Sequence, residues 1–269
     1  MGLPKISVII PSFNQAQFIG ETLKSVIAQN YPALELIVID GGSEDGSADV
    51  IRQHEKHIAY WVSESDNGQT DALIKGFNRS TGEIQCWLNS DDQLLPGTLH
   101  QVAEYFEKHT DVDVVFGDTI WINVAGEEIR RQREIPFNRF IWMFTYNYMP
   151  GMSTFWRRSI YEAIGGLDPQ FNLVMDADLW IRMSYAGKIG HVRNFWSYMR
   201  FYDEQKNRRL RDDSNREDMV IRSRYWGTER PPFMKVKRLT AQLIRTTWKL
   251  LTGCYYPGYV RNLENRPQV

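Results

Sequence analysis

The chain has 269 residues, a formal net charge of −1 and two cysteines, a length that allows one large domain or two small ones. The balanced charge offers no field to attract nucleic acid, and Cys86 and Cys254 form neither a disulfide framework nor a spaced metal site. No run reaches the 18 apolar residues of a membrane span, and a strand follows almost at once after the first residue. We therefore expect a cytoplasmic protein, soluble or peripheral to a membrane.

The first half of the chain alternates short apolar runs with amphipathic segments. The expected strands and helices are 6–10, 18–29, 34–39, a helix from 47, 58–62, 70–78 and 84–88. This spacing predicts an α/β fold with a Rossmann-like, mostly parallel sheet and helices on both faces. Each strand ends in a polar or glycine-rich loop, and ligands of such sheets bind outside the carboxyl ends of the strands.

Two adjacent acids, Asp91 and Asp92, follow the strand expected at 84–88. Neighbouring carboxylates repel each other, and burying them unpaired is costly. Mg²⁺ or Mn²⁺ would relieve the repulsion, because these cations prefer oxygen ligands. The alternative is a solvated acidic turn that only leads into the next helix.

The glycines of the second loop narrow the class of enzyme. Gly41 and Gly42 let the main chain approach a ligand closely, although they also fit a simple tight turn. Neither G-x-G-x-x-G nor G-x-x-x-x-G-K-[ST] is present. A dinucleotide-binding dehydrogenase and a P-loop enzyme are therefore disfavoured.

Three loops together resemble the inverting family 2 glycosyltransferases, which have the GT-A fold. The resemblance covers residues 5–199 and rests on ISVIIPSFNQ, VIDGGSEDGS and LNSDD. It implies that Asp92 holds a cation against the diphosphate of a nucleotide-sugar donor and that Asp91 lies on the ribose side. The further donor contacts that it implies are Pro11, Ser12, Phe13, Asp40 and Gln69.

Gly41 departs from the family pattern, because it replaces the second acid of the usual D-D-G-S, which contacts the base. Uridine or thymidine is still the expected base. For Gln69, a solvated glutamine is the alternative to a donor contact.

The second half begins with a strand expected at 112–116, ending in Gly117-Asp118, and a hairpin at 120–130. Residues 136–149 are rich in aromatic side chains. These would form a platform for an acceptor sugar or, given their helical spacing, a buried stripe.

Residues 175–182, MDADLWIR, resemble the family's E-D-x-D-L-W-x-R, with Met175 in place of the glutamate. Asp176 falls on the acid that acts as catalytic base. A carboxylate that takes the acceptor's proton typically contributes about 10²–10⁴-fold to the rate. The alternative is helix capping by Asp176 or Asp178, and Asp178, just before the apolar run, is the expected N-cap.

Residues 199–206 occupy the place of the family's R-x-H segment, with Tyr202 where a histidine is usual. The cation is therefore expected to rest on Asp92, diphosphate oxygens and water. Arg200 and Lys206 are expected to neutralise the leaving nucleoside diphosphate, with solvated surface positions as the alternative.

The C-terminal part is strongly charged. Residues 207–224 predict an exposed helix or a flap, and residues 233–251 predict a basic amphipathic helix. That helix would lie on an anionic membrane, or pack on the domain or in a homodimer. The predicted organisation is a domain at 1–228, with a donor half 1–118 and an acceptor half 119–206, and a tail at 229–269.

The sequence thus predicts a metal-dependent inverting glycosyltransferase with a UDP- or dTDP-sugar donor. Its acceptor would be a saccharide or lipid-linked hydroxyl in surface polysaccharide or glycolipid assembly, at the inner face of the membrane. One alternative, supported by Met175 and Tyr202, is a nucleotide-sugar-binding subunit without catalysis. A nucleotidyltransferase is disfavoured, because residues 11–14 lack a glycine- and lysine-rich loop that grips a triphosphate.

Overall fold

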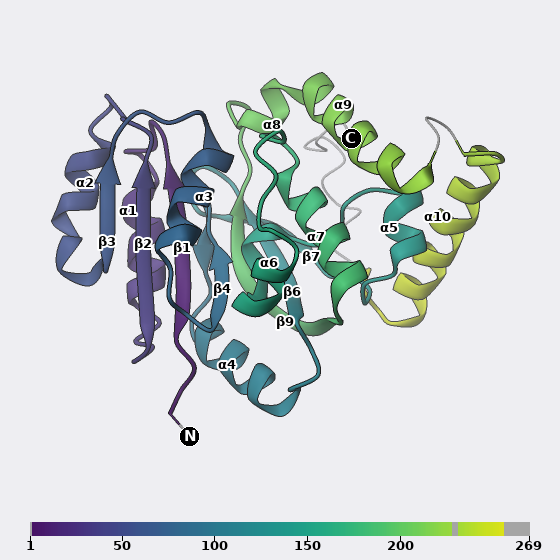
Figure 1. Cartoon of the computed structure of the whole chain (residues 1–269), viewed down its shortest axis with the longest axis horizontal. Coiled ribbons are helices and arrows are strands. Elements are labelled where there is room, and N and C mark those ends of the chain that lie inside the picture. The colour runs from purple at the N-terminus through teal and green to yellow at the C-terminus, as the bar shows by residue number, and fades with distance from the viewer. Residues whose placement is uncertain (1, 228–230, 256–269) are drawn as a thin grey trace.

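The computed structural model describes residues 2–227 and 231–255 (Figure 1). In this part of the chain, nine strands form one sheet in the order β3-β2-β1-β4-β8-β6-β9-β5, with β7 paired to β6. The strands are β1 Ile6–Ser12, β2 Leu34–Asp40, β3 Tyr60–Ser63, β4 Ile84–Trp87, β5 Gln93–Leu94, β6 Val114–Ile122, β7 Glu128–Gln132, β8 Thr154–Arg157 and β9 Ile189–Arg200. The helices are α1 Ile19–Ile27, α2 Ser47–Gln53, α3 Gln69–Arg79, α4 Thr98–Lys108, α5 Arg139–Phe144, α6 Arg158–Ala163, α7 Met175–Ala186, α8 Lys206–Arg209, α9 Arg211–Trp226 and α10 Met234–Leu251, with short 3₁₀ turns η1 Glu55–His57 and η2 Gly151–Ser153.

The first half of the chain forms the parallel part of the sheet. β1 pairs in parallel with β2 and β4, and β2 pairs in parallel with β3. Every residue of β1 is buried, with α1 and α3 covering opposite faces of the sheet (Figure 1). The predicted α/β class is confirmed. The carboxyl ends of four parallel strands therefore meet at one edge.

Strands from the second half of the chain add antiparallel pairs, so the whole sheet is mixed. β8 pairs antiparallel with β4 and β6, and β6 pairs in parallel with β9. The predicted hairpin is confirmed as the antiparallel pair β6–β7. The predicted end of the strand at Gly117-Asp118 is wrong, because β6 continues to Ile122. A Cβ on Gly117 would lie 2.6 Å from the Trp196 ring, so this glycine admits β9 at close range and does not stop β6.

β5 was not predicted from the sequence. It consists of Gln93 and Leu94, directly after the acid pair, and pairs antiparallel with Ser197 and Tyr198 of β9. Two residues are too few for an alternating pattern to be visible. This short pairing brings the carboxyl end of β9 beside the acid loop.

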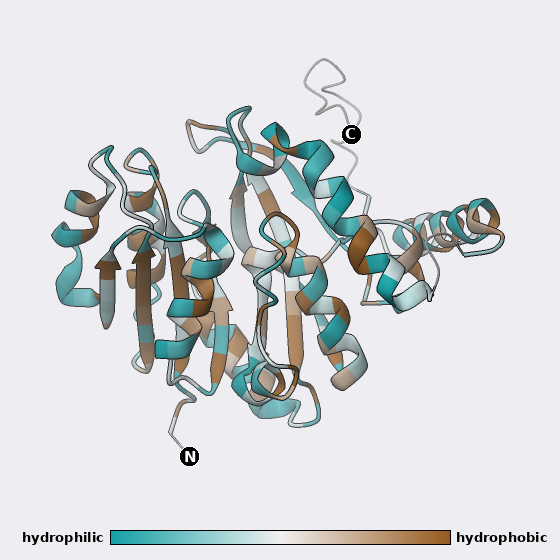
Figure 2. Ribbon diagram, turned by 45° about the horizontal axis from the view of Figure 1, so that its top comes forward, coloured by the Kyte–Doolittle hydropathy of each residue, from teal (hydrophilic) through white to brown (hydrophobic). Residues whose placement is uncertain are grey.

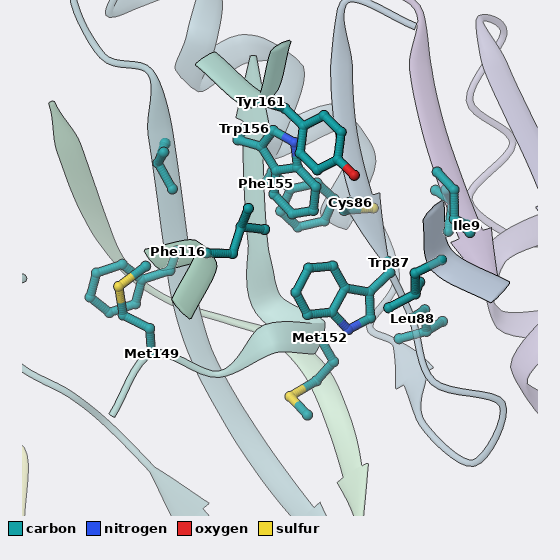
Figure 3. Close-up of a cluster of buried hydrophobic side chains, with 14 of the residues drawn as sticks. Ile9, Cys86, Trp87, Leu88, Phe116, Met149, Met152, Phe155, Trp156 and Tyr161 are labelled. Carbon is teal, nitrogen blue, oxygen red and sulfur yellow. The ribbon is translucent and has the colours of Figure 1, made fainter. Parts of the chain in front are cut away.

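The core holds a cluster of large aromatic side chains (Figure 3). Trp87 stacks on Trp180 with ring centroids 5.3 Å apart and an interplanar angle of 3°, and Trp156 meets both rings edge-on at 5.5 Å. Trp87 ends β4, four residues before Asp91, and Trp180 lies one helical turn after Asp176. The stack therefore holds the acid loop in a fixed position relative to α7.

The C-terminal part is helical, as predicted. The charged stretch forms α8 and α9, and α10 packs on α5 (Figures 1 and 2). Among the helices of the described residues, none has both the length and the apolar character needed to cross a membrane. The predicted boundary between 228 and 229, and the tail residues 256–269, lie outside the described residues, so the division into domain and tail stays a prediction.

Candidate active site

A cavity of about 2140 Å³ opens at the carboxyl edge of the parallel strands. Loops that follow β1, β2, β3 and β4 line one part of it, and residues 145–152, the start of α7 and the segment 199–210 line another part, together with residues of β6, β7 and α10. The predicted site residues that line it are Pro11, Ser12, Phe13, Gln69, Asp91, Asp92, Asp176 and Lys206. Asp40 and Arg200 are not in the lining.

Asp92 is the more buried member of the acid pair, with 1% of its surface exposed. Its Oδ1 accepts a hydrogen bond from the Arg200 main-chain N–H at 2.9 Å, and its Oδ2 accepts one from Asn89 Nδ2 at 2.9 Å. Thr22 Oγ1 donates to the main-chain oxygens of Ser90 and Asp92 at 2.9 and 2.7 Å. Asp92 is thus already held on both carboxylate oxygens.

Asp91 is only partly buried. Its Oδ2 accepts hydrogen bonds from the Tyr202 hydroxyl at 2.9 Å and from Gln205 Nε2 at 3.4 Å. Its Oδ1 accepts none from side chains in the described part of the chain. Asp91 is therefore the acid with an oxygen left for a ligand.

The pair carries unfavourable negative charge. Burial and the charge of Asp91 raise the pKa of Asp92 well above its usual range, and burial raises the pKa of Asp91. Within residues 2–227 and 231–255, no lysine or arginine forms an ion pair with either carboxylate, and no group of three His, Cys, Asp or Glu side chains could hold a metal ion. The pair fits a divalent cation only if a bound ligand completes the shell of oxygens.

Arg200 does not face the cavity as predicted, because its guanidinium is buried and bonded to the protein. It donates to the main-chain oxygens of Asp91 at 3.1 Å and Val124 at 2.7 Å, and Nη2 pairs with Glu21 at 2.6 Å. The Phe18 ring lies 4.4 Å from the guanidinium carbon. Arg200 therefore supports the acid loop through a hydrogen bond to its main chain, and the geometry does not favour a direct donor contact.

Asp40 is fully buried, and the geometry does not favour its predicted donor contact either. Its oxygens accept hydrogen bonds from Ser43 N–H at 2.9 Å, Ser43 Oγ at 2.6 Å and Ser63 Oγ at 2.6 Å. Asp40 thus joins the loop that follows β2 to the last residue of β3.

Asp66 enters the cavity beside Gly41. A Cβ on Gly41 would lie 2.7 Å from Asp66 Oδ2, so the missing side chain at position 41 leaves room for this carboxylate. Asp66 Oδ1 accepts a hydrogen bond from Gly68 N–H at 2.8 Å, and burial raises the pKa of Asp66. The family's second acid after β2 is absent here, and an acid from the loop that follows β3 lies next to its position.

The remaining donor-side residues face the cavity with different partners. Gln69 begins α3 and donates to Asn89 Oδ1 at 2.9 Å, which extends the hydrogen bonds around Asp92. Lys206 Nζ donates to the Asn172 main-chain oxygen at 2.8 Å, and burial lowers its pKa. Ser12 Oγ is buried without a hydrogen-bond partner in the described residues, and Phe13 is 61% exposed.

Asp176 lies in the first turn of α7 and is partly buried. Its Oδ2 accepts a hydrogen bond from Asn147 Nδ2 at 2.8 Å. Asn147 Oδ1 in turn accepts from Trp142 Nε1 at 3.2 Å and Met149 N–H at 3.3 Å, which turns its amide nitrogen toward Asp176. Burial raises the pKa of Asp176 to about 6.

The predicted N-cap at Asp178 is wrong. α7 begins at Met175 with Val174 as N-cap, so Asp178 lies inside the first turn. It is 1% exposed and pairs with Arg182 at 2.6 Å. Asp178 therefore belongs to the core side of α7, while Asp176 faces the cavity.

The aromatic stretch 136–149 serves in two ways. Of the stripe predicted from helical spacing (Phe137, Phe140, Ile141 and Phe144), Ile141 is fully buried, whereas Phe140 is 38% exposed, so the stripe is buried only in part. Tyr146 and Tyr148 line the cavity, but Tyr148 is 2% exposed, so the ring available to a sugar is that of Tyr146, which is 48% exposed.

Several lining residues were not predicted as site residues. Asn147 is a polar residue within an aromatic stretch, and Asp66 precedes an Asn-Gly pair, so weak local signals existed. The lining also includes Arg238, Gln242, Arg245 and Thr246 of α10. Their contribution depends on how α10 packs, which no local pattern reveals.

Comparison with known sequences identifies the family of this chain. The sequence profile of glycosyl transferase family 2 matches residues 7–165. An uncharacterized glycosyltransferase of Mycobacterium tuberculosis is 32% identical over 181 residues, which make up 66% of this chain and 68% of that protein. The chain belongs to glycosyltransferase family 2, and it is a glycosyltransferase.

Solved structures share the fold. S. aureus TarS 1–349 in complex with UDP-GlcNAc matches with a TM-score of 0.67 and 16% identity, over 92% of this chain and 75% of that one, and a longer TarS structure is covered over 45% of its length. The mannosyltransferase PcManGT of Pyrobaculum calidifontis, in complex with GDP-Man and Mn²⁺, matches with a TM-score of 0.63 and 18% identity, over 90% of this chain and 70% of that one. The predicted GT-A fold is confirmed.

Proposed function

We propose that this enzyme moves a sugar from a nucleotide-sugar donor to an acceptor hydroxyl, with inversion at the anomeric carbon and with a divalent cation. The observation that carries the proposal is the acid pair Asp91–Asp92 and the carboxylate of Asp176 in one cavity, with the Asp176 pKa raised to about 6. A group with that pKa is mostly deprotonated at neutral pH and can accept a proton.

The proposed reaction is a single displacement. The acceptor oxygen bonds to the anomeric carbon while the bond from that carbon to the diphosphate breaks, and the diphosphate leaves with the electron pair. Asp176 takes the proton from the acceptor hydroxyl. Attack from the face opposite the leaving group inverts the configuration.

The donor is proposed to lie along the loops that follow β1 to β4. Phe13 would stack on the base, and the unpartnered Ser12 Oγ would bond a polar donor group. Asp66 would accept a hydrogen bond from a base N–H, in place of the acid missing at position 41. UDP- or dTDP-sugars are the proposed donors, because uracil and thymine carry a ring N–H for this bond, which adenine and cytosine lack.

A divalent cation, Mg²⁺ or Mn²⁺, is proposed at the acid pair. When bound, it would act as a Lewis acid on the departing diphosphate. The sequence predicts Asp92 as its ligand, but the free oxygen of Asp91 makes that acid the better direct ligand and Asp92 its support. Lys206 would add positive charge beside the leaving group.

The acceptor is proposed to be a saccharide or a lipid-linked hydroxyl that contacts the exposed ring of Tyr146 near Asp176. Stacking of rings on sugar faces supports this side of the cavity for the acceptor. The proposed setting is surface polysaccharide or glycolipid assembly in the cytoplasm, at the inner face of the membrane.

The cation assignment is tested by titrating a nucleoside diphosphate with and without Mn²⁺ in a calorimeter. Mn²⁺ should increase the affinity for the nucleoside diphosphate. In Asp91→Asn this increase should be smaller by about tenfold or more, because one contact to the bridging cation would be lost. Asp92→Asn should reduce it less. Asp203→Asn, an exposed acid outside the cavity lining, is the control.

The outcomes separate the two acids. If Asp92→Asn alone abolishes the Mn²⁺ effect, the cation rests on Asp92, as the sequence predicts. If neither substitution changes it, the acid pair is not the metal site.

A further inference from the structure

α10 exposes a continuous apolar stripe on its outer surface. Val236, Leu239, Leu243 and Leu250 recur at spacings of three, four and seven residues, which places them on one face of the helix. Each of these four side chains is 59–68% exposed. Leu251 is 82% exposed at the end of the helix. So many large exposed apolar side chains on one helix mark a docking surface.

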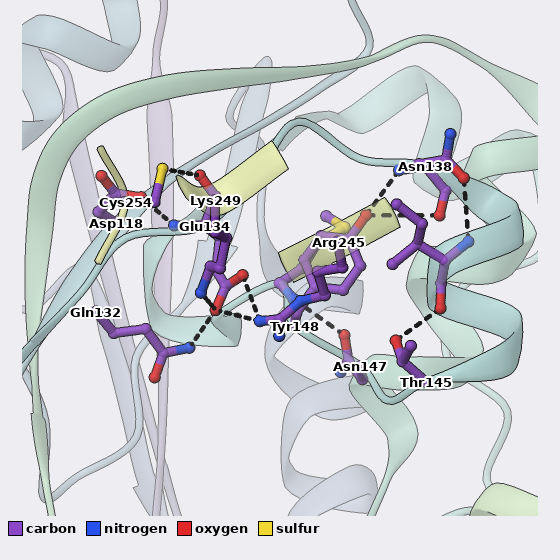
Figure 4. A network of polar contacts seen from close by, with 12 residues as sticks. Asp118, Gln132, Glu134, Asn138, Thr145, Asn147, Tyr148, Arg245, Lys249 and Cys254 are labelled. Atoms are coloured by element: carbon purple, nitrogen blue, oxygen red, sulfur yellow. Dashed lines mark hydrogen bonds and ion pairs between the residues drawn. The ribbon is translucent and has the colours of Figure 1, made fainter. Parts of the chain in front are cut away.

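Polar contacts on the inner side fix the orientation of this helix (Figure 4). Glu134, 1% exposed, pairs with Arg245 at 2.7 Å and with Lys249 at 2.9 Å. Ala241, on the same side of the helix, is buried. Two of the helix's basic residues therefore hold it to the domain. The apolar stripe, which usually faces a core, faces outward.

The charge of α10 favours one kind of partner. Its 18 residues contain no acid and five cations, which are Lys235, Lys237, Arg238, Arg245 and Lys249. Contact with α10 of a second copy would bring cations together with no acid on either helix to offset them. An anionic surface offsets the exposed cations, and Lys235 is exposed beside the stripe.

We propose that α10 docks this enzyme on an anionic lipid bilayer, with the apolar stripe inserted among the acyl chains and Lys235 at the phosphate level. An amphipathic helix with apolar and basic residues binds in this way. Arg238, Gln242 and Thr246, on another side of the same helix, line the cavity. Docking would therefore place the cavity next to the lipid surface.

The proposal does not depend on the proposed function, because lipid binding is measured without donor or acceptor. The experiment is flotation of the full chain with vesicles of phosphatidylcholine, alone and mixed with phosphatidylglycerol. Mixed vesicles should bind the protein, and high salt should weaken binding by screening the cations. Since the apolar stripe does not respond to salt, part of the binding should persist.

The key variant is Leu239→Gln with Leu243→Gln, which should reduce binding at least tenfold. Both side chains are exposed, so the fold should be kept, and circular dichroism with a thermal melt checks this. The matched control is Met219→Gln with Val220→Gln, which removes two apolar side chains of α9, 50% and 46% exposed. The control should bind like the wild type.

Three results would overturn the proposal. One is equal binding of both double variants. Another is a dimeric mass of the wild type that the Leu239/Leu243 variant converts to a monomer, which would assign the stripe to a second copy. The third is vesicle binding only after removal of residues 256–269. That result would assign the apolar stripe, in the full chain, to that segment and not to a bilayer.

Discussion

Asp176 is the residue on which the proposed chemistry depends most. Burial raises its pKa to about 6, and only the deprotonated carboxylate can accept a proton. The kcat/KM for the acceptor should therefore fall about tenfold per pH unit below 6 and be constant above about 7. The measurement is kcat/KM from pH 4.5 to 8.5, and a flat profile across pH 6 would contradict the assignment.

Asn147 should act as a positioning residue for Asp176. Its Nδ2 donates to Asp176 Oδ2, which favours the carboxylate, so Asn147→Ala should raise the pKa of Asp176 further. The rising limb of the pH profile should shift upward by about one unit, since a hydrogen bond to a charged group contributes about 1.5 kcal/mol. Asn194→Ala, outside the cavity lining, is the control. A lower rate with no shift of the limb would mean that Asn147 only supports the fold.

Asp66 should contribute to base recognition. Asp66→Asn replaces one acceptor oxygen by a donor, so affinity for UDP should fall about tenfold or more. Gly41→Ala should act in the same direction, because the new Cβ would displace the Asp66 carboxylate. Calorimetric titration with UDP measures both. Unchanged affinity in Asp66→Asn would remove this residue from the site.

At the scale of elements, the α10 anchor can be tested through stability. Glu134→Gln removes the buried negative charge that Arg245 and Lys249 share. Leaving buried cations without their partner typically costs about 3–5 kcal/mol, and the free energy of unfolding should fall by that order. Denaturant unfolding measures it. Glu162→Gln, at an exposed ion pair, should cause almost no change, and equal effects would contradict the anchor.

The elements differ in how much their sequence reveals. β1 to β4 were predicted because each is a short apolar run followed by a turn, and this signal is local. β5 was not, because its two residues exist as a strand only through pairing with β9. Gly117 was misread as a strand end, because its role depends on Trp196, 79 residues away.

The candidate site also has features that the local sequence reveals and features that depend on tertiary contacts. The loops that follow the parallel strands lie where the strand pattern predicts, because parallel strands share one carboxyl edge. The orientation of single side chains within the loops could not be predicted from the sequence. Asp40 and Arg200 are charged and adjacent to the cavity, but internal hydrogen bonds turn both away from it. Such choices depend on tertiary contacts with Ser63 and Val124.

The whole molecule joins two halves that meet at the cavity. The acid pair comes from the parallel half and Asp176 from the mixed half, and the stack of Trp87 on Trp180 holds them together. Donor binding and removal of the acceptor proton should therefore be separable functions of one site.

The most direct test compares wild type and Asp176→Asn on a panel of nucleotide sugars with Mn²⁺, following release of the nucleoside diphosphate with and without an acceptor mixture. The wild type should release it from at least one donor. Asp176→Asn should bind the same nucleoside diphosphate within a few-fold of the wild type, and its acceptor-dependent release should be slower by about 10²-fold or more. Equal release rates in the two proteins, or no release from any donor by the wild type, would contradict the account.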